Sequence, residues 1–185
     1  ASCLVGSEMC IRDSLVTSLG TYAWSESDTT LYSHLFLGQT ADFEKAVVKV
    51  DSSYPWEGKV TYQVKAKMKD AFELAIHIPS HIRMDTLCVT VNGEKTDAAS
   101  CIKDGYLYLK QNWGENDVIE LTFDLPVRKI YANTNVREDE GCVALMRGPV
   151  VYCFEGVDNG ECIQALRIPR AVSYTHLRAH ETRGN

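Results

Sequence analysis

The residues of this sequence that could do chemistry are scattered, and one group alone has the spacing of a metal site. His176 and His180 lie four residues apart and are followed by Glu181, so a helix would place both imidazoles on one face. A zinc ion needs further ligands and supporting hydrogen bonds, for which the neighbouring sequence has no pattern. We therefore predict no metal site there, and none at Cys10 with Glu8.

Carboxylates and histidines elsewhere could serve acid/base catalysis. Glu138, Asp139 and Glu140 crowd a short region that also holds Arg128 and Arg137. The simpler interpretation is a solvated loop with exposed ion pairs, each worth roughly 0 to 1 kcal/mol. Three further histidines have no common spacing and are expected to be structural or surface residues: His34, His77 and His81. We predict no catalytic residue in this chain.

Two tryptophans are candidates for binding sugar, because an indole face attracts the apolar face of a sugar ring. Trp56 lies in Tyr54-Pro55-Trp56-Glu57-Gly58, where a turn whose Trp packs over the mouth of a sandwich is the simpler interpretation. Trp113 lies in a loop and is the better candidate for an exposed aromatic side chain.

The cysteines number seven and include no Cys-x-x-Cys pair. An odd number without that pair favours buried small hydrophobic residues over a disulfide framework or a zinc cluster. This prediction covers the five cysteines that are scattered through strand-like sequence: Cys88, Cys101, Cys142, Cys153 and Cys162.

Composition limits the partners. The 185 residues carry a formal net charge of -6, which argues against nucleic acid and against an anionic membrane surface. No apolar run approaches the roughly 18 residues that span a bilayer, and the N-terminus lacks the order of a signal peptide. We expect a soluble protein, whose compartment the sequence does not give.

Hydrophobic periodicity predicts one short helix followed by strands. Between Ser14 and Trp24, Leu15, Leu19 and Tyr22 fall near one helical face. From Asp28 the period changes to two, which is typical of strands. The predicted strands cover residues 31–37, 44–50, 60–65, 72–78, 87–91, 106–110, 117–125, 127–131, 143–146 and 150–154.

Turn residues separate these strands. Asn92-Gly93 tolerates the positive φ angles of a type I′ hairpin turn, with residues 106–110 as the partner strand or a near neighbour and a short extra strand possible between them. Arg147-Gly148-Pro149 fits a tight change of direction, and Arg147 is expected to pair with a carboxylate. The fold class that follows is mainly β: an antiparallel, jelly-roll-like β-sandwich with one short N-terminal helix.

The two ends differ from the sequence between them. Residues 1–14 and 172–185 share none of its periodicity, and both resemble translated sequencing-adaptor text. We set them aside as non-native.

Nearly all of residues 15–171 resembles the part of glycoside hydrolase family 127 that follows its helical catalytic barrel. The order and spacing of several segments carry the resemblance: Leu19-Gly20-Thr21-Tyr22, Ser53 to Val60, Phe72-Glu73-Leu74, Ile78-Pro79-Ser80, Val91 to Glu94, Tyr106-Leu107, Pro126-Val127-Arg128, Val136-Arg137 and Val143 to Tyr152. The resemblance implies that residues 15–28 are the last helix of an (α/α)6 barrel and that residues 29–171 form one or more accessory sandwich domains.

The family resemblance also implies a chemistry. The family that this chain resembles is of bacterial type, and its members are retaining exo-β-L-arabinofuranosidases whose nucleophile is a cysteine held near zinc by other cysteines and a glutamate. The paired cysteines of the family precede this helix, and this chain has no Cys-Cys pair. We therefore expect no cofactor in this fragment, with zinc implied only for the parent family.

Two hypotheses follow. The first is a non-catalytic sandwich fragment of a glycoside hydrolase that acts on terminal β-L-arabinofuranosides or related plant-type glycans, with the catalytic barrel of the same parent chain as partner. The second is an independent carbohydrate-binding module that binds an arabinose-containing oligosaccharide through Trp56 or Trp113.

Overall fold

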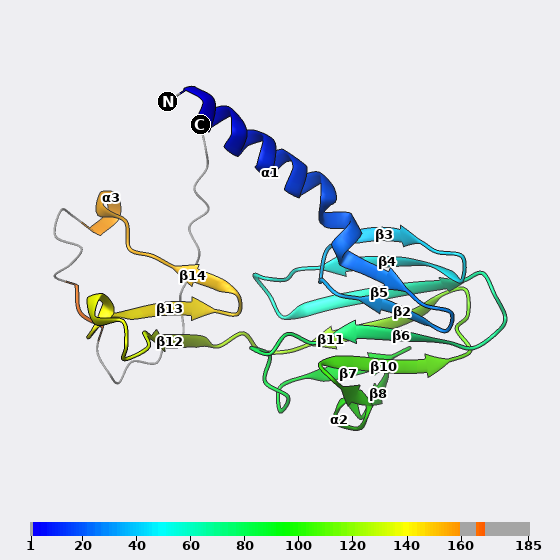
Figure 1. The fold of residues 1–185 in the computed structure, drawn as a ribbon. Helices are drawn as coiled ribbons and strands as arrows, with labels where there is room; N and C mark the ends of the chain where they lie inside the picture. Colours follow the sequence, from blue (N-terminus) through cyan, green and yellow to red (C-terminus); the bar gives the residue numbers. More distant parts are fainter. Residues whose placement is uncertain (1, 160–165, 169–185) are drawn as a thin grey trace. The chain divides into compact units, whose positions relative to one another are not determined.

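The computed structural model describes residues 2–159 and 166–168 (Figure 1). His176, His180, Glu181 and Cys162 lie outside the described residues. The chain divides into two units, Ala1–Asp124 and Leu125–Asn185, and both are built mainly from strands. The prediction of a mainly β fold with antiparallel sheets is confirmed.

Helix α1 covers Ser2–Ala23, so it begins well before the predicted start at residue 14. It ends one residue earlier than predicted, because Trp24 belongs to strand β1 and is only 9% exposed. The carbonyl of Ala23 accepts a hydrogen bond from the backbone N–H of His34 (2.8 Å), which fixes the end of the helix to the first unit.

The first sheet of unit 1, called sheet A, has the order β1-β2-β6-β10-β9. Its strands are β1 (Trp24–Glu26), β2 (Thr30–Ser33), β6 (Phe72–His77), β10 (Tyr106–Gln111) and β9 (Ile102–Lys103). All pairs are antiparallel except β2 with β6, which run parallel. Strand β2 ends at Ser33, short of the predicted 31–37, because the His34 N–H is bonded to Ala23 and not to a neighbouring strand.

The second sheet, called sheet B, has the order β3-β4-β5-β11-β7-β8. Its strands are β3 (Gln39–Asp42), β4 (Ala46–Ser52), β5 (Lys59–Ala66), β11 (Asp117–Thr122), β7 (Cys88–Val91) and β8 (Glu94–Thr96). A short helix α2 (Ala98–Cys101) follows β8, and the Asp97 side chain caps it by accepting from the Ala99 N–H.

The core of unit 1 lies between the buried faces of these sheets. Alternate residues are buried along the central strands, as the period of two predicts: Leu74, Ile76, Leu107 and Leu109 in sheet A, and Val48, Val60, Tyr62, Val64, Ile119 and Leu121 in sheet B. The hydroxyls of Tyr62 and Ser33 join the two faces at 2.9 Å. Burial raises the pKa of Tyr62 well above its ordinary value, so its hydroxyl stays protonated.

The Asn-Gly hairpin has a different partner from the predicted one. Asn92 and Gly93 both have positive φ angles (53° and 83°), as a type I′ turn requires. They connect β7 to β8, whereas residues 106–110 lie in β10 of sheet A. The short strand expected between them is present as β9.

Unit 2 contains a three-stranded sheet with the order β12-β13-β14. The strands are β12 (Val127–Tyr131), β13 (Val143–Arg147) and β14 (Val150–Tyr152), with a 3-10 turn η1 (Arg137–Asp139) and a short helix α3 (Gly156–Asn159). Gly148 turns the chain between β13 and β14 with φ +57°. The partner seen for Arg147 is the carbonyl of Leu125 (Nε to O, 3.2 Å), where a carboxylate was predicted.

Candidate functional site

The outer side of sheet A carries a group of aromatic and imidazole rings. This tyrosine–histidine face consists of Tyr32, His34, His77, Tyr106 and Tyr108, all half-buried. Strand register assembles it, because Tyr106 lies opposite His77 and both Tyr32 and Tyr108 lie opposite Ala75. Figure 1 shows the strands concerned, β2, β6 and β10, side by side.

The rings pack against one another and cover the sheet. Tyr106 meets Tyr32 and His34 edge-on at 5.8 Å between centroids, and His77 lies 5.2 Å from Tyr106. Ala75 at the centre of the face is 0% exposed. A small residue between two tyrosines leaves room for their rings to cover it, and the outcome is a patch of amphipathic rings.

Two members of the face, His34 and Tyr106, are hydrogen-bonded to each other. His34 binds the Tyr106 hydroxyl through Nδ1 and the Ser25 hydroxyl through Nε2, both at 2.8 Å. Burial, and secondarily the nearby His77, lower the pKa of His34 below its ordinary value. The imidazole is therefore held in its neutral form at neutral pH. A catalytic acid would instead have to be protonated at that pH.

The tyrosine–histidine face was not predicted as a unit. Tyr32 with His34, and Tyr106 with Tyr108, are spaced two residues apart, which is the signal for one face of a strand. That signal could have marked two aromatic pairs. It could not show that β2, β6 and β10 are neighbours, because these strands are far apart in the sequence.

The two predicted sugar-binding tryptophans lie in contrasting environments. Trp56 is 48% exposed in the turn before β5, so about half of its side chain is accessible to a ligand. Trp113 is only 5% exposed, which corrects the expectation of an exposed loop residue. Its indole Nε1 donates to the Phe72 carbonyl at 3.0 Å, and its ring packs against the Phe72 ring, so Trp113 belongs to the core.

His81 also lies beside a tyrosine. Its Nε2 is 3.0 Å from the Tyr54 hydroxyl, and the two rings stack at 6.0 Å. Burial raises the pKa of Tyr54, so the hydroxyl is a neutral partner. All three histidines singled out in the sequence thus contact tyrosines, in accord with structural roles.

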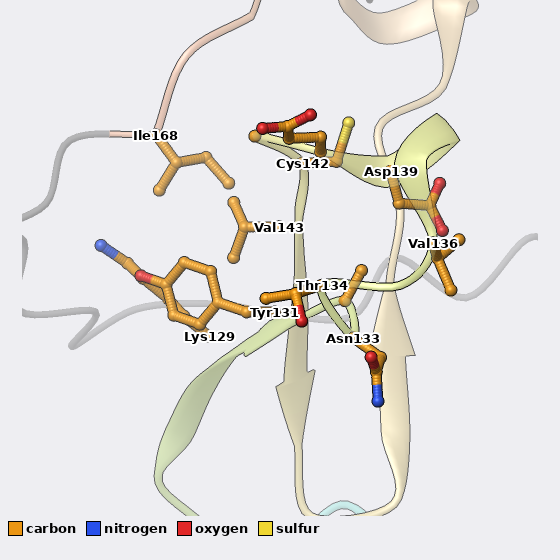
Figure 2. A pocket seen from close by; sticks show the side chains of 12 residues that line it. Lys129, Tyr131, Asn133, Thr134, Val136, Asp139, Cys142, Val143 and Ile168 are labelled. Atoms are coloured by element: carbon orange, nitrogen blue, oxygen red, sulfur yellow. The ribbon is translucent and has the colours of Figure 1, made fainter.

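Unit 2 has a hollow of about 480 Å³ at the end of its sheet (Figure 2). Asp139 and Glu140, which the sequence places in an acidic loop, line this hollow together with Lys129 and Tyr131. Figure 2 shows Lys129 and Tyr131 on one side and Asp139 beside Val136 on the other. Tyr131 is 69% exposed, so the hollow is open to solvent.

The cysteines do not form a zinc thiolate site in the part of the chain that the structure describes. Cys88, Cys101, Cys142 and Cys153 are free, and no three His, Cys, Asp or Glu side chains gather among the described residues. Cys142 and Cys153 are exposed, which corrects their prediction as buried hydrophobic residues; both lie in the second unit, where few of the described side chains are buried. The described residues therefore do not fit the zinc ion that the family resemblance implies.

A two-sheet sandwich with an aromatic outer face, followed by a small three-stranded unit, defines a β-sandwich module. Comparison with protein families then identifies it. The model of the β-L-arabinofuranosidase, glycoside hydrolase family 127 middle domain matches residues 30–125, and that of the family 127 C-terminal domain matches residues 127–180. The chain belongs to glycoside hydrolase family 127. The second match extends into residues 172–185, which the sequence analysis set aside.

Relatives agree with this assignment. The chain is 38% identical over 151 residues to a non-reducing end β-L-arabinofuranosidase of Bifidobacterium longum subsp. longum, covering 78% of this chain and 22% of that protein. A crystal structure of a family 127 β-L-arabinofuranosidase from Geobacillus stearothermophilus T6 superposes with a TM-score of 0.71 at 37% identity, covering 79% of this chain and 23% of the other. A second solved family 127 β-arabinofuranosidase gives 0.68 at 28% identity, covering 76% and 25%.

The chain thus spans about a quarter or less of the length of these relatives. Among the described residues, no helix combines the length and apolar character needed to cross a membrane.

Proposed function

We propose that this chain is a non-catalytic β-sandwich region of a glycoside hydrolase that acts on terminal β-L-arabinofuranosides or related plant-type glycans, and that it supports the catalytic barrel of the same polypeptide. The observation that carries the proposal is the match of the family's middle and C-terminal domains to residues 30–125 and 127–180. The zinc and the cysteine nucleophile that the resemblance implies would belong to the barrel, together with the hydrolysis itself.

The end of α1 supports this role. Leu15, Leu19 and Tyr22 follow helical spacing and are 56%, 38% and 62% exposed. A stripe of this kind is costly to leave in water and is typical of a helix that packs against other helices. It fits the proposal that the part of α1 from Leu15 to Ala23 is a remnant of the last helix of an (α/α)6 barrel, whereas the predicted range 15–28 runs on into β1 of sheet A.

Hydrolysis of p-nitrophenyl β-L-arabinofuranoside tests the proposal. The 185-residue chain should release no p-nitrophenol above the uncatalysed rate, with or without added zinc, whereas the longer polypeptide of the same gene should be active. Activity in the 185-residue chain would contradict the proposal and would direct attention to Glu57, Glu138 and Asp139.

An independent carbohydrate-binding module is the second candidate, favoured by the exposure of Trp56. Its ligand would be an arabinose-containing oligosaccharide stacked on the indole. Trp24 and Trp113 are buried, so a change in tryptophan emission on titration with such oligosaccharides should come from Trp56 and should be absent from Trp56→Phe. Unchanged emission in the unsubstituted chain would remove the main support for this candidate.

A further inference from the structure

We propose that the tyrosine–histidine face of sheet A is the surface on which the catalytic domain of the same polypeptide docks. This inference rests on the proposed function and deepens it, because it assigns the contact to one side of the sandwich and to particular residues: Tyr32, His34, His77, Tyr106 and Tyr108.

Chain connectivity places the partner beside this face. Helix α1 ends at Ala23 and β1 begins at Trp24, so no linker residue separates the proposed barrel helix from the edge strand of sheet A. The Ala23 carbonyl is bonded to the N–H of His34, a member of the face. The next residue of β1, Ser25, binds the His34 side chain. The domain ahead of α1 is thus tethered next to these rings at a high effective concentration.

The chemistry of the face suits burial. Its tyrosine rings have apolar faces, and the central Ala75 is already fully buried. His34 has both ring nitrogens bonded within the protein, and one of these bonds also engages the Tyr106 hydroxyl. Because these polar atoms already have partners, removing water from them costs little. The lowered pKa of His34 keeps a formal charge away from the centre of the face.

The margins of the face carry the charges. Glu73 lies opposite Lys110 across β6 and β10, beyond the Tyr108 and Ala75 pair. Thr30 donates to the Glu73 carboxylate at 3.2 Å. An apolar aromatic centre with a polar rim is the common anatomy of a protein–protein interface, in which tyrosine is enriched.

Sheet B lacks these features on its outer side. The exposed positions of its central strands include Lys49, Gln63 and Lys65, and Lys49 lies opposite Gln63 across β4 and β5. Long charged side chains of this kind favour water over a partner. The relatives are much longer than this chain, so they contain further domains. Sheet A is the better candidate for the side of the sandwich that such a domain would cover.

Chemical footprinting tests the assignment. The 185-residue chain and the longer polypeptide of the same gene are each iodinated under mild conditions, and the modified tyrosines are located by mass spectrometry. Tyr32, Tyr106 and Tyr108 should react several-fold more slowly in the longer polypeptide. Acetylation of Lys49 and Lys65 on sheet B provides the matched control and should proceed at the same rate in both.

The outcomes separate this inference from the function on which it rests. Equal tyrosine reactivity in both polypeptides, or slower acetylation of the sheet B lysines in the longer one, would overturn the docking face even if that polypeptide hydrolyses the arabinofuranoside. If the tyrosines of the isolated 185-residue chain become protected as its concentration rises, the face binds a second copy of the chain. That outcome would also overturn the docking of the catalytic domain. Tyrosine protection without any hydrolysis by the longer polypeptide would uphold the docking face while the proposed reaction fails.

Discussion

The outer sides of the two sheets in unit 1 differ although both belong to one sandwich. Sheet A presents tyrosine and histidine rings that contact each other and bury Ala75. Sheet B presents lysine, glutamine and threonine side chains at the equivalent positions of its central strands, including Lys49, Thr61 and Gln63.

Since both sheets contribute similar apolar inner faces, the core does not account for this difference. A sheet with one solvated side normally alternates apolar and polar residues, as sheet B does. Sheet A instead has a layer of aromatic and imidazole rings on its outer side, and the burial of ring surface is stabilising when something covers it. The outer faces, and not the core, therefore distinguish the two sheets.

Replacing the centre of the aromatic face should have the largest effect. Ala75→Asp would place a charge among Tyr32, Tyr108 and the sheet, where it has no partner. We expect the free energy of unfolding to fall by roughly 3 kcal/mol, measured by urea denaturation. Gln63→Asp on sheet B introduces the same residue at an exposed strand position and should cost much less; equal losses of unfolding free energy would contradict the difference between the two outer faces.

The hydroxyl pair between the inner faces should have a moderate effect. Tyr62→Phe leaves the buried Ser33 hydroxyl without its 2.9 Å partner, so we expect a loss of about 1 to 2 kcal/mol. Adding Ser33→Ala to that variant removes the orphaned hydroxyl and should cost less than the sum of the two single substitutions. Strict additivity in thermal or urea unfolding would show that the two hydroxyls do not interact.

The smallest expected effect concerns pH. The pKa of His34 is lowered by folding, so the unfolded chain takes up the proton first, at the ordinary value of 6.5. The contribution of His34 to stability is therefore present above that pH and is lost as the pH falls below it. His34→Gln should reduce the difference in unfolding free energy between about pH 7.5 and pH 5.5. An unchanged difference would show that His34 is not held neutral.

Much of this fold could be predicted from the sequence, because the alternation of apolar residues is local. Val60, Tyr62 and Val64 point to the core as their spacing predicts, and Asn92-Gly93 forms the predicted turn. Which strands pair could not be predicted in this way. The partner of β7 was placed in the wrong strand, and the parallel pairing of β2 with β6 was missed, because register and sheet order depend on contacts between distant segments.

The candidate site was less predictable for the same reason. The tyrosine–histidine face depends on three strands meeting, so the histidines appeared unrelated in the sequence. Trp113 was misjudged because residues 112–116 connect two strands and suggested exposure, whereas the Phe72 carbonyl gives its indole a buried partner. Exposure of a loop aromatic is a tertiary property, which the spacing of residues does not encode.

We propose above all that the catalytic domain covers the aromatic outer face of sheet A. The most direct test is the stability of one paired substitution, Tyr106→Ser with Tyr108→Ser, in the 185-residue chain and in the longer polypeptide. Thr61→Ser with Gln63→Ser on sheet B serves as the control pair. We expect the tyrosine pair of substitutions to lower the melting temperature of the longer polypeptide more than that of the 185-residue chain. The control pair should change the two melting temperatures equally. An equal shift from the tyrosine pair in both polypeptides would contradict the proposed docking.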